Sequence, residues 1–413
     1  MRMEESIVVG IDIGTTKICT LVARVEGSNR LRILGVGIEP SAGIRKGGII
    51  DINSASQSII RSVEKAQRTS GLEINSALVS LAGNHVTSFN SRGVVGISHG
   101  IIETNDFTRA IEAARAIAIP HNQEVIHVIQ RGFTVDGQEG IRMPVGMHGY
   151  RLEVEAHIIT AAAGTVENIR KCVEQAGVTV SQFVLSPLAA GEAVLSENER
   201  QMGVAVCDIG SGTTDMAIYI DGDIWHTIVI PIGGDLITSD IAHGLRLPIS
   251  QAETVKKQYG IASKKSVKDD EMVTVRSFSR EEPARISRSD LAHVIEARVE
   301  EIFELIVQEI KRSGYDGLLP AGLVLTGGTS NLPEISKVAS EVTGLATRIA
   351  KPENLVGLVD QLHSPAYSTS IGLLQWAVMM NETIVPGIIY SEREYVESSR
   401  LSSVMNWVKR LLP

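Results

Sequence analysis

Residues 8–17 have the sequence VVGIDIGTTK, and residues 204–215 have the sequence VAVCDIGSGTTD. Each stretch runs from an apolar segment into an aspartate, a glycine turn and a pair of threonines. Each is followed by two strand-like segments, ICTLVARVEG and RLRILGVGI after the first and MAIYIDG and DIWHTIVIPIGG after the second. We interpret this repeat as two related α/β halves that face each other. The alternative is a chance similarity between two buried hairpins.

Both turns contain the residue types that a phosphate site needs. Glycines let backbone N–H groups approach phosphate oxygens, and hydroxyls add further donors. A carboxylate beside the accompanying divalent metal completes such a site and can act through metal-bound water. One turn alone would fit a plain β-hairpin equally well, but two turns from opposed halves could grip one triphosphate. The candidate residues are Asp12, Gly14, Thr15, Thr16 and Lys17 in the first turn and Asp208, Gly210, Ser211, Gly212, Thr213, Thr214 and Asp215 in the second.

Two further glycine turns could line the same site. Gly327 and Gly328 follow an apolar strand in LVLTGGTSN, where an adenine could lie flat on the backbone. Gly233 and Gly234 open the helical segment LITSDIAHGL, whose first N–H groups could face phosphate. Taken singly, each is equally an ordinary turn. The loop motifs of other nucleotide-binding folds, G-x-x-x-x-G-K-[ST] and a G-x-G-x-x-G after a strand, do not occur.

Composition limits the classes of function. The chain has 413 residues, 43% apolar content and a net charge of −9, which argues for a large core and against a general nucleic-acid binder. Three widely spaced cysteines fit a reducing, cytosolic compartment. There is no signal-peptide pattern and no apolar run near the roughly 20 residues that span a bilayer, so we expect any membrane contact to be peripheral.

Helical periodicity predicts a helix over residues 52–70, stopped by Gly71, and a long amphipathic helix over residues 291–311. Arg288, Ser289 and Asp290 offer capping groups for the second helix. Short strands around one helix, FTRAIEAARAIA, predict a small α+β subdomain inserted into the first half. A charge-rich second insertion covers roughly residues 248–288.

These elements together resemble the superfamily of actin, hexokinase and the heat-shock chaperones. Residues 186–193, SPLAAGEA, and residues 370–374, SIGLL, are similar to its two connecting helices, whose small residues let helices cross closely. Within the superfamily the chain resembles the FtsA family of bacterial division proteins, over essentially its whole length. The segments that carry this resemblance are PIGGDLITSDIAHGLRLPISQAETVKKQYG and RISRSDLAHVIEARVEEIFELI.

The resemblance implies an actin-like fold of two α/β halves with a nucleotide cleft between them. It further implies two inserted subdomains and a C-terminal amphipathic helix. The expected division is residues 1–83 and 166–202 for the first half, 84–165 for its insertion, 203–230 and 300–385 for the second half, 231–299 for the second insertion, 386–397 for a linker and 398–413 for a membrane-targeting helix.

The same resemblance implies ATP and Mg²⁺ as cofactors, with Asp12 and Asp208 facing the metal. Gly327, Gly328 and Thr329 would line the adenosine pocket. Glu192 matches the position that orients the attacking water, so Glu192 and Asp208 are the expected catalytic groups, with at most weak ATPase activity. The residues that would reach the ribose and base are Glu253, Lys256 and Lys257. The same three residues fit an exposed, charged helix face nearly as well.

As a function, the resemblance implies a polymerising protein that tethers FtsZ filaments to the cytoplasmic face of the cell membrane at the division site. Expected partners are the FtsZ C-terminal tail, further copies of the chain, other division proteins and an anionic membrane surface, but no nucleic acid. Arg285 and Arg288 would meet the acidic FtsZ tail, although they could equally solvate a loop and cap a helix. Alternatives are a true ATPase or sugar kinase of the same fold, a chaperone-like ATPase, a pilus-assembly protein like PilM and the ethanolamine-utilisation relatives.

The segment SSRLSSVMNWVKRLLP, residues 398–413, predicts an amphipathic helix when it is placed at about 100° per residue. One arc is apolar, and the opposite arc carries Lys409 and Arg410, which suit anionic head groups. A terminal helix docked on its own core would show the same periodicity. The residues expected at the membrane are Leu401, Val404, Met405, Trp407, Val408, Lys409, Arg410, Leu411 and Leu412.

Overall fold

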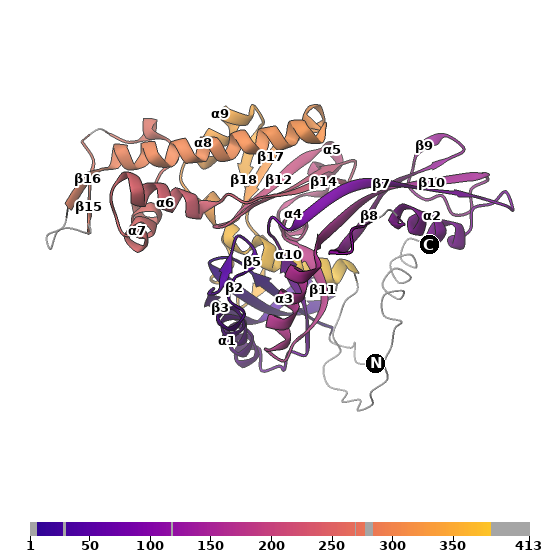
Figure 1. Ribbon diagram of the computed structural model, residues 1–413, viewed down its shortest axis with the longest axis horizontal. Helices are drawn as coiled ribbons and strands as arrows, with labels where there is room; N and C mark the ends of the chain where they lie inside the picture. The colour runs from indigo at the N-terminus through magenta and orange to yellow at the C-terminus, as the bar shows by residue number, and fades with distance from the viewer. Residues whose placement is uncertain (1–5, 28–29, 117–118, 269, 277–283, 381–413) are drawn as a thin grey trace.

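The computed structural model describes residues 6–27, 30–116, 119–268, 270–276 and 284–380. The expected linker and membrane-targeting helix therefore lie outside the described residues. Figure 1 shows an elongated molecule with a lower body, a long helix α8 along the top and an extension at either end. Among the helices of the described part, none is both long enough and apolar enough to cross a bilayer.

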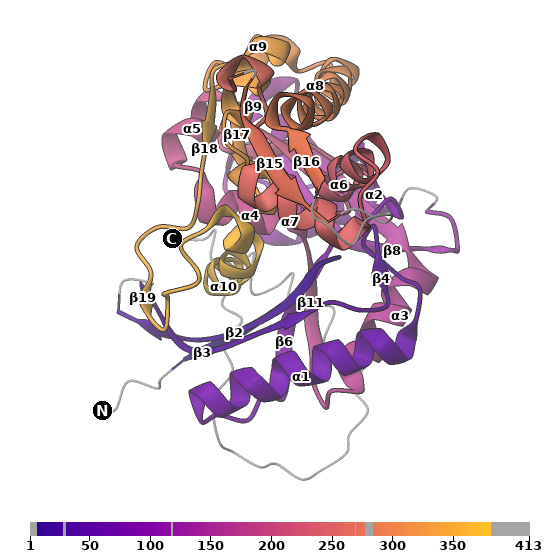
Figure 2. The ribbon, with the colours of Figure 1, turned by 90° about the vertical axis from the view of Figure 1, so that its left-hand side faces the viewer.

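The first half is built on a six-stranded sheet in the order β11-β6-β1-β2-β3-β19. Helices α1 and α3 pack on one face through a core of Val, Ile and Ala side chains (Figure 2). The bounds are β1 Ile7–Ile13, β2 Lys17–Glu26, β3 Arg30–Pro40, β6 Ser76–Leu81, β11 Thr179–Leu185, β19 Val356–Gly357, α1 Ile52–Ser70 and α3 Ala163–Glu174, with a small hairpin of β4 Ile44–Arg45 and β5 Gly48–Ile49.

The second half repeats this arrangement in a five-stranded sheet, in the order β14-β13-β12-β17-β18. Strand β12 forms a hairpin with β13 and lies parallel to β17, just as β1 forms a hairpin with β2 and lies parallel to β6. The two halves therefore share one topology, which confirms the repeat. The bounds are β12 Val204–Ile209, β13 Thr214–Ile220, β14 Asp223–Ile230, β17 Leu323–Thr326 and β18 Thr347–Ile349.

Helices of the second half pack on its sheet around one continuous core that includes Phe303. The same core takes in side chains from α6, α7 and β15, so the expected second insertion is packed onto this half. The bounds are α5 Glu197–Met202, α6 Gly234–Gly244, α7 Ile249–Tyr259, β15 Met272–Val275, β16 Ala284–Ser287, α8 Arg288–Ser313, α9 Ile335–Thr343 and the 3₁₀ turns η1 Lys264–Ser266, η2 Asp316–Leu318, η3 Gly328–Asn331 and η4 Pro365–Tyr367.

A separate four-stranded antiparallel sheet, in the order β7-β10-β8-β9, carries helix α2 on one face around its own core. We call this unit the inserted subdomain. Figure 1 shows it at the end of the molecule opposite the β15–β16 hairpin. It branches from the first half but bonds to the second, because Ser88 Oγ donates to Thr227 O at 2.7 Å. The bounds are β7 Val86–Gly96, α2 Thr104–Arg115, β8 Gln123–Val135, β9 Gln138–Ile141 and β10 Arg151–Ala162.

Two helices cross between the halves: α4, Ser186–Val194, and α10, Ser368–Met380. They approach so closely that a Cβ on Gly372 would lie 1.7 Å from the carbonyl oxygen of Ala189. A stretch of small residues is therefore required at this crossing, as the sequence predicts.

The helix predicted over residues 52–70 is confirmed, with Asp51 as its N-cap and Gly71 as its left-handed C-cap. The predicted start of the long helix at residue 291 is wrong by one turn. Helix α8 begins at Arg288 because the Ser287 hydroxyl accepts the backbone N–H of Asp290. The capping group is therefore Ser287, and the boundary expected between residues 299 and 300 falls inside this continuous helix.

Candidate functional site: a cavity between the two halves

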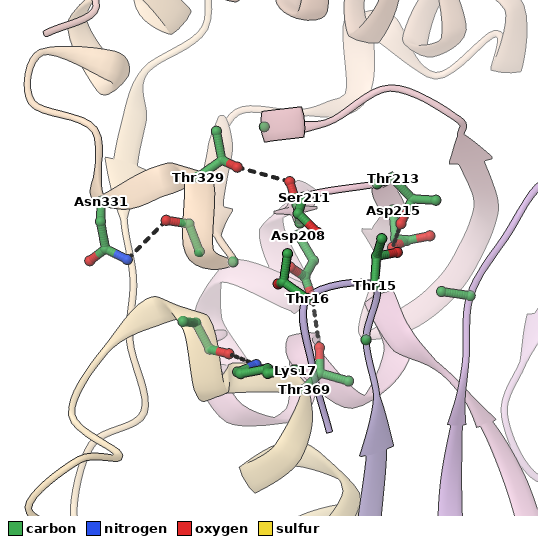
Figure 3. Close-up of a pocket in the computed structure, with 18 of the residues that line it drawn as sticks. Thr15, Thr16, Lys17, Asp208, Ser211, Thr213, Asp215, Thr329, Asn331 and Thr369 are labelled. Atoms are coloured by element: carbon green, nitrogen blue, oxygen red, sulfur yellow. Dashed lines mark hydrogen bonds between the residues drawn. The ribbon is translucent and has the colours of Figure 1, made fainter. Parts of the chain in front are cut away.

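A cavity of about 470 Å³ lies between the halves, and both Gly-Thr turns line it. We keep the names first turn for residues 12–17 and second turn for residues 208–215. Figure 3 shows side chains of the first turn, the second turn, η3 and α10 converging on this space. The expected residues that line the cavity are Asp12, Gly14, Thr15, Thr16, Lys17, Asp208, Gly210, Ser211, Gly212, Thr213, Asp215, Gly234, Glu253, Lys256, Lys257, Gly327, Gly328 and Thr329.

The first turn closes the β1–β2 hairpin, with the Gly14 N–H donating to Lys17 O at 3.0 Å. Asp12 is the penultimate residue of β1 and is buried. Its Oδ1 accepts the Ser80 hydroxyl at 3.0 Å, and its Oδ2 accepts the Ser370 hydroxyl at 2.7 Å. The carboxylate is thus held in one orientation at the edge of the cavity.

Lys17 contributes a cation to the same wall. Its Nζ donates to Ala366 O at 2.6 Å, lies 3.8 Å from Asp12 Oδ2 and sits 4.8 Å from the centre of the Tyr367 ring. Burial acts to lower the pKa of Lys17, but the carboxylates of Asp12 and Asp208 outweigh it and raise the pKa. The ammonium group therefore stays charged inside the cleft.

The second turn closes the β12–β13 hairpin in the same way, with the Gly210 N–H donating to Thr213 O at 2.9 Å. Burial raises the pKa of Asp208 to about 6, although Asp208 Oδ2 accepts the Thr369 hydroxyl at 2.5 Å. Burial and the nearby Asp208 also raise the pKa of Asp215 well above its usual value. The second turn therefore brings two acids of raised pKa to the cavity where the first turn brings an acid and a cation.

The two turns touch across the cavity. A Cβ placed on Gly212 would lie 2.6 Å from Thr15 Oγ1 and 3.2 Å from the Lys46 backbone. A larger residue at position 212 requires the Thr15 side chain to rotate away or the turns to move apart. The glycine is thus what allows the two halves to close around the space they share.

The turn after β17 forms the opposite wall. Gly327 has φ 86°, a conformation that favours glycine, and a Cβ there would lie 2.3 Å from Asp208 Oδ1. The Thr329 hydroxyl donates to Gly210 O at 2.8 Å and so ties this wall to the second turn (Figure 3). The backbone of Gly328 is left facing the cavity.

Helix α7 contributes the charged group predicted from the resemblance. Glu253 lies 2.7 Å from Lys256 and 3.0 Å from Lys257, and it accepts the Thr238 hydroxyl. Burial acts to raise the pKa of Glu253, but the hydrogen bonds from Lys256 and Thr238 outweigh it and lower the pKa to about 2. The group therefore stays ionised at the cavity wall and is not a freely solvated helix face.

Three expected residues do not line the cavity. The Thr214 hydroxyl points back to Ile232 O at 2.8 Å, because β13 begins at this residue and turns its side chain into the core. Gly233 lies behind the second turn, where a Cβ would meet Ser211 O at 2.6 Å. The carboxylate of Glu192 forms an ion pair with Arg200 at 2.8 Å, and Glu192 is not among the residues that line the cavity.

Sequence reasoning missed several lining residues. Ser186 is the first residue of α4 and the one residue of that helix among the lining groups. Thr369 and Ala366 come from the segment that begins α10, and Asn331 comes from η3. The sequence STSIG at residues 368–372 could have pointed to Thr369, since it places hydroxyls at the start of a predicted connecting helix.

The donors at the cavity suit a magnesium ion that keeps most of its water. Asp215 Oδ1 is buried without a hydrogen-bond partner, and Asp12 and Asp208 line the same space. The described part of the chain has no group of three or more His, Cys, Asp or Glu side chains that would enclose a metal. Mg²⁺ commonly binds through one or two carboxylates plus substrate phosphates, so this donor set fits.

The arginines expected at a partner surface differ in their surroundings. Arg285 lies on β16 with an exposed side chain. Arg288 opens α8, pairs with Glu271 at 2.5 Å and donates to Tyr259 O at 3.1 Å. Arg288 therefore braces the β15–β16 hairpin, whereas Arg285 has its charge available at the surface.

Comparison with solved structures gives the fold. The PilM–PilN type IV pilus biogenesis complex matches with a TM-score of 0.65 at 17% identity, over 92% of this chain and 99% of that one. MreB5 of Spiroplasma citri, solved with ADP, matches with a TM-score of 0.55 at 16% identity, over 92% and 99%. At such identities these matches show the fold alone, and they confirm that it is actin-like.

Comparison with family models and with related sequences finds higher identity than the comparison with solved structures. The model described as cell division protein FtsA matches residues 205–372, and the model described as the SHS2 domain inserted in FtsA matches residues 83–160. The cell division protein FtsA of Pseudomonas aeruginosa is 41% identical over 406 residues, covering 97% of both chains. That of Escherichia coli K12 is 37% identical over 415 residues, covering 99% of this chain and 97% of that one. With the cleft, the repeated halves and the inserted subdomain, these matches show that the chain belongs to the FtsA family of actin-like cell division proteins.

Proposed function

We propose that this protein binds ATP with magnesium in the cavity between its halves, polymerises, and tethers FtsZ filaments to the cytoplasmic face of the cell membrane at the division site. The observation that carries the proposal is the meeting of two Gly-Thr turns across one cavity of about 470 Å³. The solved MreB5 structures with ADP and with AMPPNP support nucleotide binding in this fold. The solved double helical filament of MamK supports polymerisation.

Different residues of the cavity contact different parts of the nucleotide in this proposal. Backbone N–H groups of the two turns and the hydroxyls of Thr15 and Ser211 donate to the phosphates. Lys17 offsets phosphate charge from the first turn. Bound magnesium would neutralise charge on the phosphates, with Asp12 and Asp208 accepting hydrogen bonds from its waters. Gly328 and the Glu253–Lys256 pair are placed to contact the nucleoside end.

Hydrolysis is at most slow in this proposal. Glu192, the expected water-orienting residue, is paired with Arg200 outside the cavity, and the α4 residue that lines the cavity is Ser186. A serine hydroxyl is a weak general base. Nucleotide therefore acts in this chain mainly by closing the halves and supporting the polymer.

Calorimetric titration with ATP and MgCl₂ tests the cofactor. Asp12→Ala and Asp208→Ala should each weaken Mg-ATP binding, because each removes a carboxylate from the metal side of the cavity. Asp316→Ala, at an exposed position in η2, is the matched control. Wild-type affinity in both cavity variants would contradict the nucleotide site.

An FtsZ-tail binding assay tests the partner surface. Arg285→Glu should abolish binding of the acidic tail and leave the fold intact, because the Arg285 side chain is exposed. Arg288→Glu is a less direct test, since it also breaks the pair with Glu271 that braces the hairpin. Normal tail affinity of a folded Arg285→Glu protein would remove this surface from the proposal.

Vesicle co-sedimentation tests the tether. Removing residues 399–413, or changing both Trp407 and Leu411 to Glu, should release the protein from anionic vesicles. Ser403→Thr, on the polar arc, is the control. One short helix should bind weakly, so the polymer, which presents many tails together, should bind more tightly than the monomer. Undiminished co-sedimentation after the deletion would refute the tether, and lost thermal stability would favour a docked helix.

A further inference from the structure

One segment of five residues, 366–370, bonds to three charged groups of the two turns, Asp12, Lys17 and Asp208. Lys17 Nζ donates to Ala366 O at 2.6 Å. The Thr369 hydroxyl donates to Asp208 Oδ2 at 2.5 Å, and the Ser370 hydroxyl donates to Asp12 Oδ2 at 2.7 Å (Figure 3 shows the Thr369 bond). The charged groups come from opposite halves of the molecule, but these partners come from one short segment, with Ala366 in η4 and Thr369 and Ser370 at the start of α10.

These hydrogen bonds are shielded from solvent. Thr369 is 6% exposed and Ser370 is 1% exposed, and the Asp12 carboxylate is buried as well. A hydrogen bond from a hydroxyl to a carboxylate is stronger in buried surroundings than at the surface. Each hydroxyl therefore holds one oxygen of its carboxylate, and the Ser80 hydroxyl holds the other oxygen of Asp12 at 3.0 Å.

Helix α10 is itself rigidly placed. Its Gly372 packs on the Ala189 backbone of α4, and a Cβ on Gly10 of β1 would lie 3.0 Å from Leu373 Cβ. The helix cannot shift at Gly372 and Leu373 without moving β1 or α4. The hydroxyls that bond to Asp12 and Asp208 are thus carried by a helix that is packed tightly against both β1 and α4.

The far end of α10 reaches the inserted subdomain. Trp376 is 5% exposed, and its ring meets the ring of His127 on β8 edge-on at 5.4 Å. His127 is fixed in turn, because its Nε2 accepts the Leu185 N–H at 3.2 Å. About two turns of α10, roughly 10 Å of helix from Thr369 to Trp376, therefore connect the carboxylates at the cavity with a buried ring contact on another subdomain.

We propose that Thr369 and Ser370 are positioning residues that hold Asp208 and Asp12 from one turn of α10, and that through them engagement of the two carboxylates is transmitted along α10 to Trp376 and the inserted subdomain. The inference rests on the proposed binding of magnesium nucleotide and goes beyond it. It assigns no direct ligand contact to either hydroxyl. It predicts instead that the magnesium-dependent part of binding, and its effect at Trp376, depend on them.

The variants distinguish a role of the hydroxyl in positioning a carboxylate from a role of the side chain in packing alone. Thr369→Val keeps the shape and removes the hydroxyl, whereas Thr369→Ser keeps the hydroxyl and removes a methyl group. Ser370→Ala is the corresponding change at Asp12. Thr343→Val is the matched control, because the Thr343 hydroxyl bonds away from the cavity: it donates to Ala339 O at 2.7 Å and accepts the Leu345 N–H at 3.2 Å.

The first measurement is ATP affinity of the full chain with MgCl₂ and with EDTA. Thr369→Val and Ser370→Ala should each weaken binding in MgCl₂ by roughly tenfold, the size expected for a lost hydrogen bond to a charged group. Binding in EDTA should change by less than about twofold, because the free phosphates do not depend on the carboxylates. Thr369→Ser should restore the magnesium-dependent affinity.

The second measurement is tryptophan fluorescence during titration with Mg-ATP. A change in the wild-type protein that disappears in Trp376→Phe identifies Trp376 as the reporter. At saturating nucleotide this change should shrink in Thr369→Val and remain whole in Thr343→Val. Thermal unfolding of each variant shows that the fold is kept.

The outcomes separate the two proposals. A wild-type protein that binds no Mg-ATP would overturn both. Wild-type binding together with equal losses in MgCl₂ and EDTA, or with no loss, would overturn the positioning role and leave the nucleotide site standing. Unaltered Trp376 fluorescence at saturation in the wild type would overturn the coupling along α10.

Discussion

The first turn and the second turn are the same hairpin with different charges. In each, a glycine N–H closes the turn on the carbonyl three residues later, Gly14 on Lys17 and Gly210 on Thr213. Strand register then pairs Asp12 with Cys19 and Asp208 with Asp215. When the two turns are aligned at Asp12 and Asp208, Lys17 corresponds to Thr213. Cys19, whose thiol is buried, corresponds to Asp215.

This register shows that the two threonine pairs are not equivalent. Thr15 and Thr16 lie within the first turn and line the cavity. In the second turn the first of the pair, Thr213, takes the place of Lys17, and Thr214 is already in β13 with its side chain buried. The sequence similarity between the turns therefore identifies a shared hairpin. The roles of the individual residues depend on the strand register and on what packs behind each position.

Exchanging the residues at one equivalent position should have the largest effect. Gly212→Thr gives the second turn the residue that the first has at Thr16, and it should weaken Mg-ATP binding by roughly 100-fold, because overpacking against Thr15 and Lys46 costs about 1–3 kcal/mol. Thr16→Gly, the reverse exchange, should cost less than roughly tenfold. Calorimetry on both proteins checks the asymmetry, and equal losses would mean that the turns do not meet as the structure places them.

Removing the cation of the first turn should have the next largest effect. Lys17→Met should weaken ATP binding by roughly 30-fold, since hydrogen bonds to charged groups contribute about 2 kcal/mol. Thr213→Val, at the corresponding position, should change affinity by about threefold, because it removes a neutral donor that bonds to Asp215 at 2.9 Å. A similar loss in both variants would contradict the division of charge between the turns.

The buried acid of the second turn should make stability depend on pH. The pKa of Asp215 is higher in the folded protein than the value of 3.8 expected when unfolded, so its contribution is present below that value and is lost as pH rises towards the folded pKa. Through that window stability should fall by up to about 1.4 kcal/mol per pH unit from this group. Denaturant unfolding in EDTA should show a flatter pH profile for Asp215→Asn than for the wild type.

The corresponding residue of the first turn is the control. Burial raises the pKa of Cys19 to about 12, so the thiol stays neutral from pH 4 to pH 8. Cys19→Ser should shift stability by a constant amount across that range. Asp208, whose pKa is also raised, to about 6, should keep part of the slope in Asp215→Asn, and a slope that this change leaves unaltered would assign the pH dependence to other groups.

The smallest effects should separate the threonine pairs. Thr214→Val should cost about 1 kcal/mol of unfolding free energy through the lost bond to Ile232 O, and it should leave ATP affinity unchanged. Thr16→Val should do the opposite, with stability kept and affinity lowered by about threefold, because Thr16 is exposed at the cavity. Chemical denaturation and calorimetry on the two proteins measure these effects. Loss of ATP affinity in Thr214→Val would mean that Thr214 belongs to the nucleotide site after all.

Local patterns predicted the elements well. The α1 helix has a cap at each end in sequence, Asp51 and Gly71, and its bounds are confirmed. The start of α8 was missed by three residues because three polar residues in a row, 288–290, offered capping groups. The true cap, Ser287, is distinguished only by its extended backbone, φ −68° and ψ 130°, and by the bond that its side chain accepts.

The sequence by itself determined the repeated hairpin, the two halves and most of the cavity, because apolar runs and glycine turns act over a few residues. Only the tertiary structure decided which polar groups share the cavity. It paired Glu192 with Arg200 away from the cleft, and it brought Thr369 to Asp208 across 161 positions of sequence. Such contacts arise where helices cross and halves close, and no local pattern encodes the distance between two residues that meet only after the chain has packed.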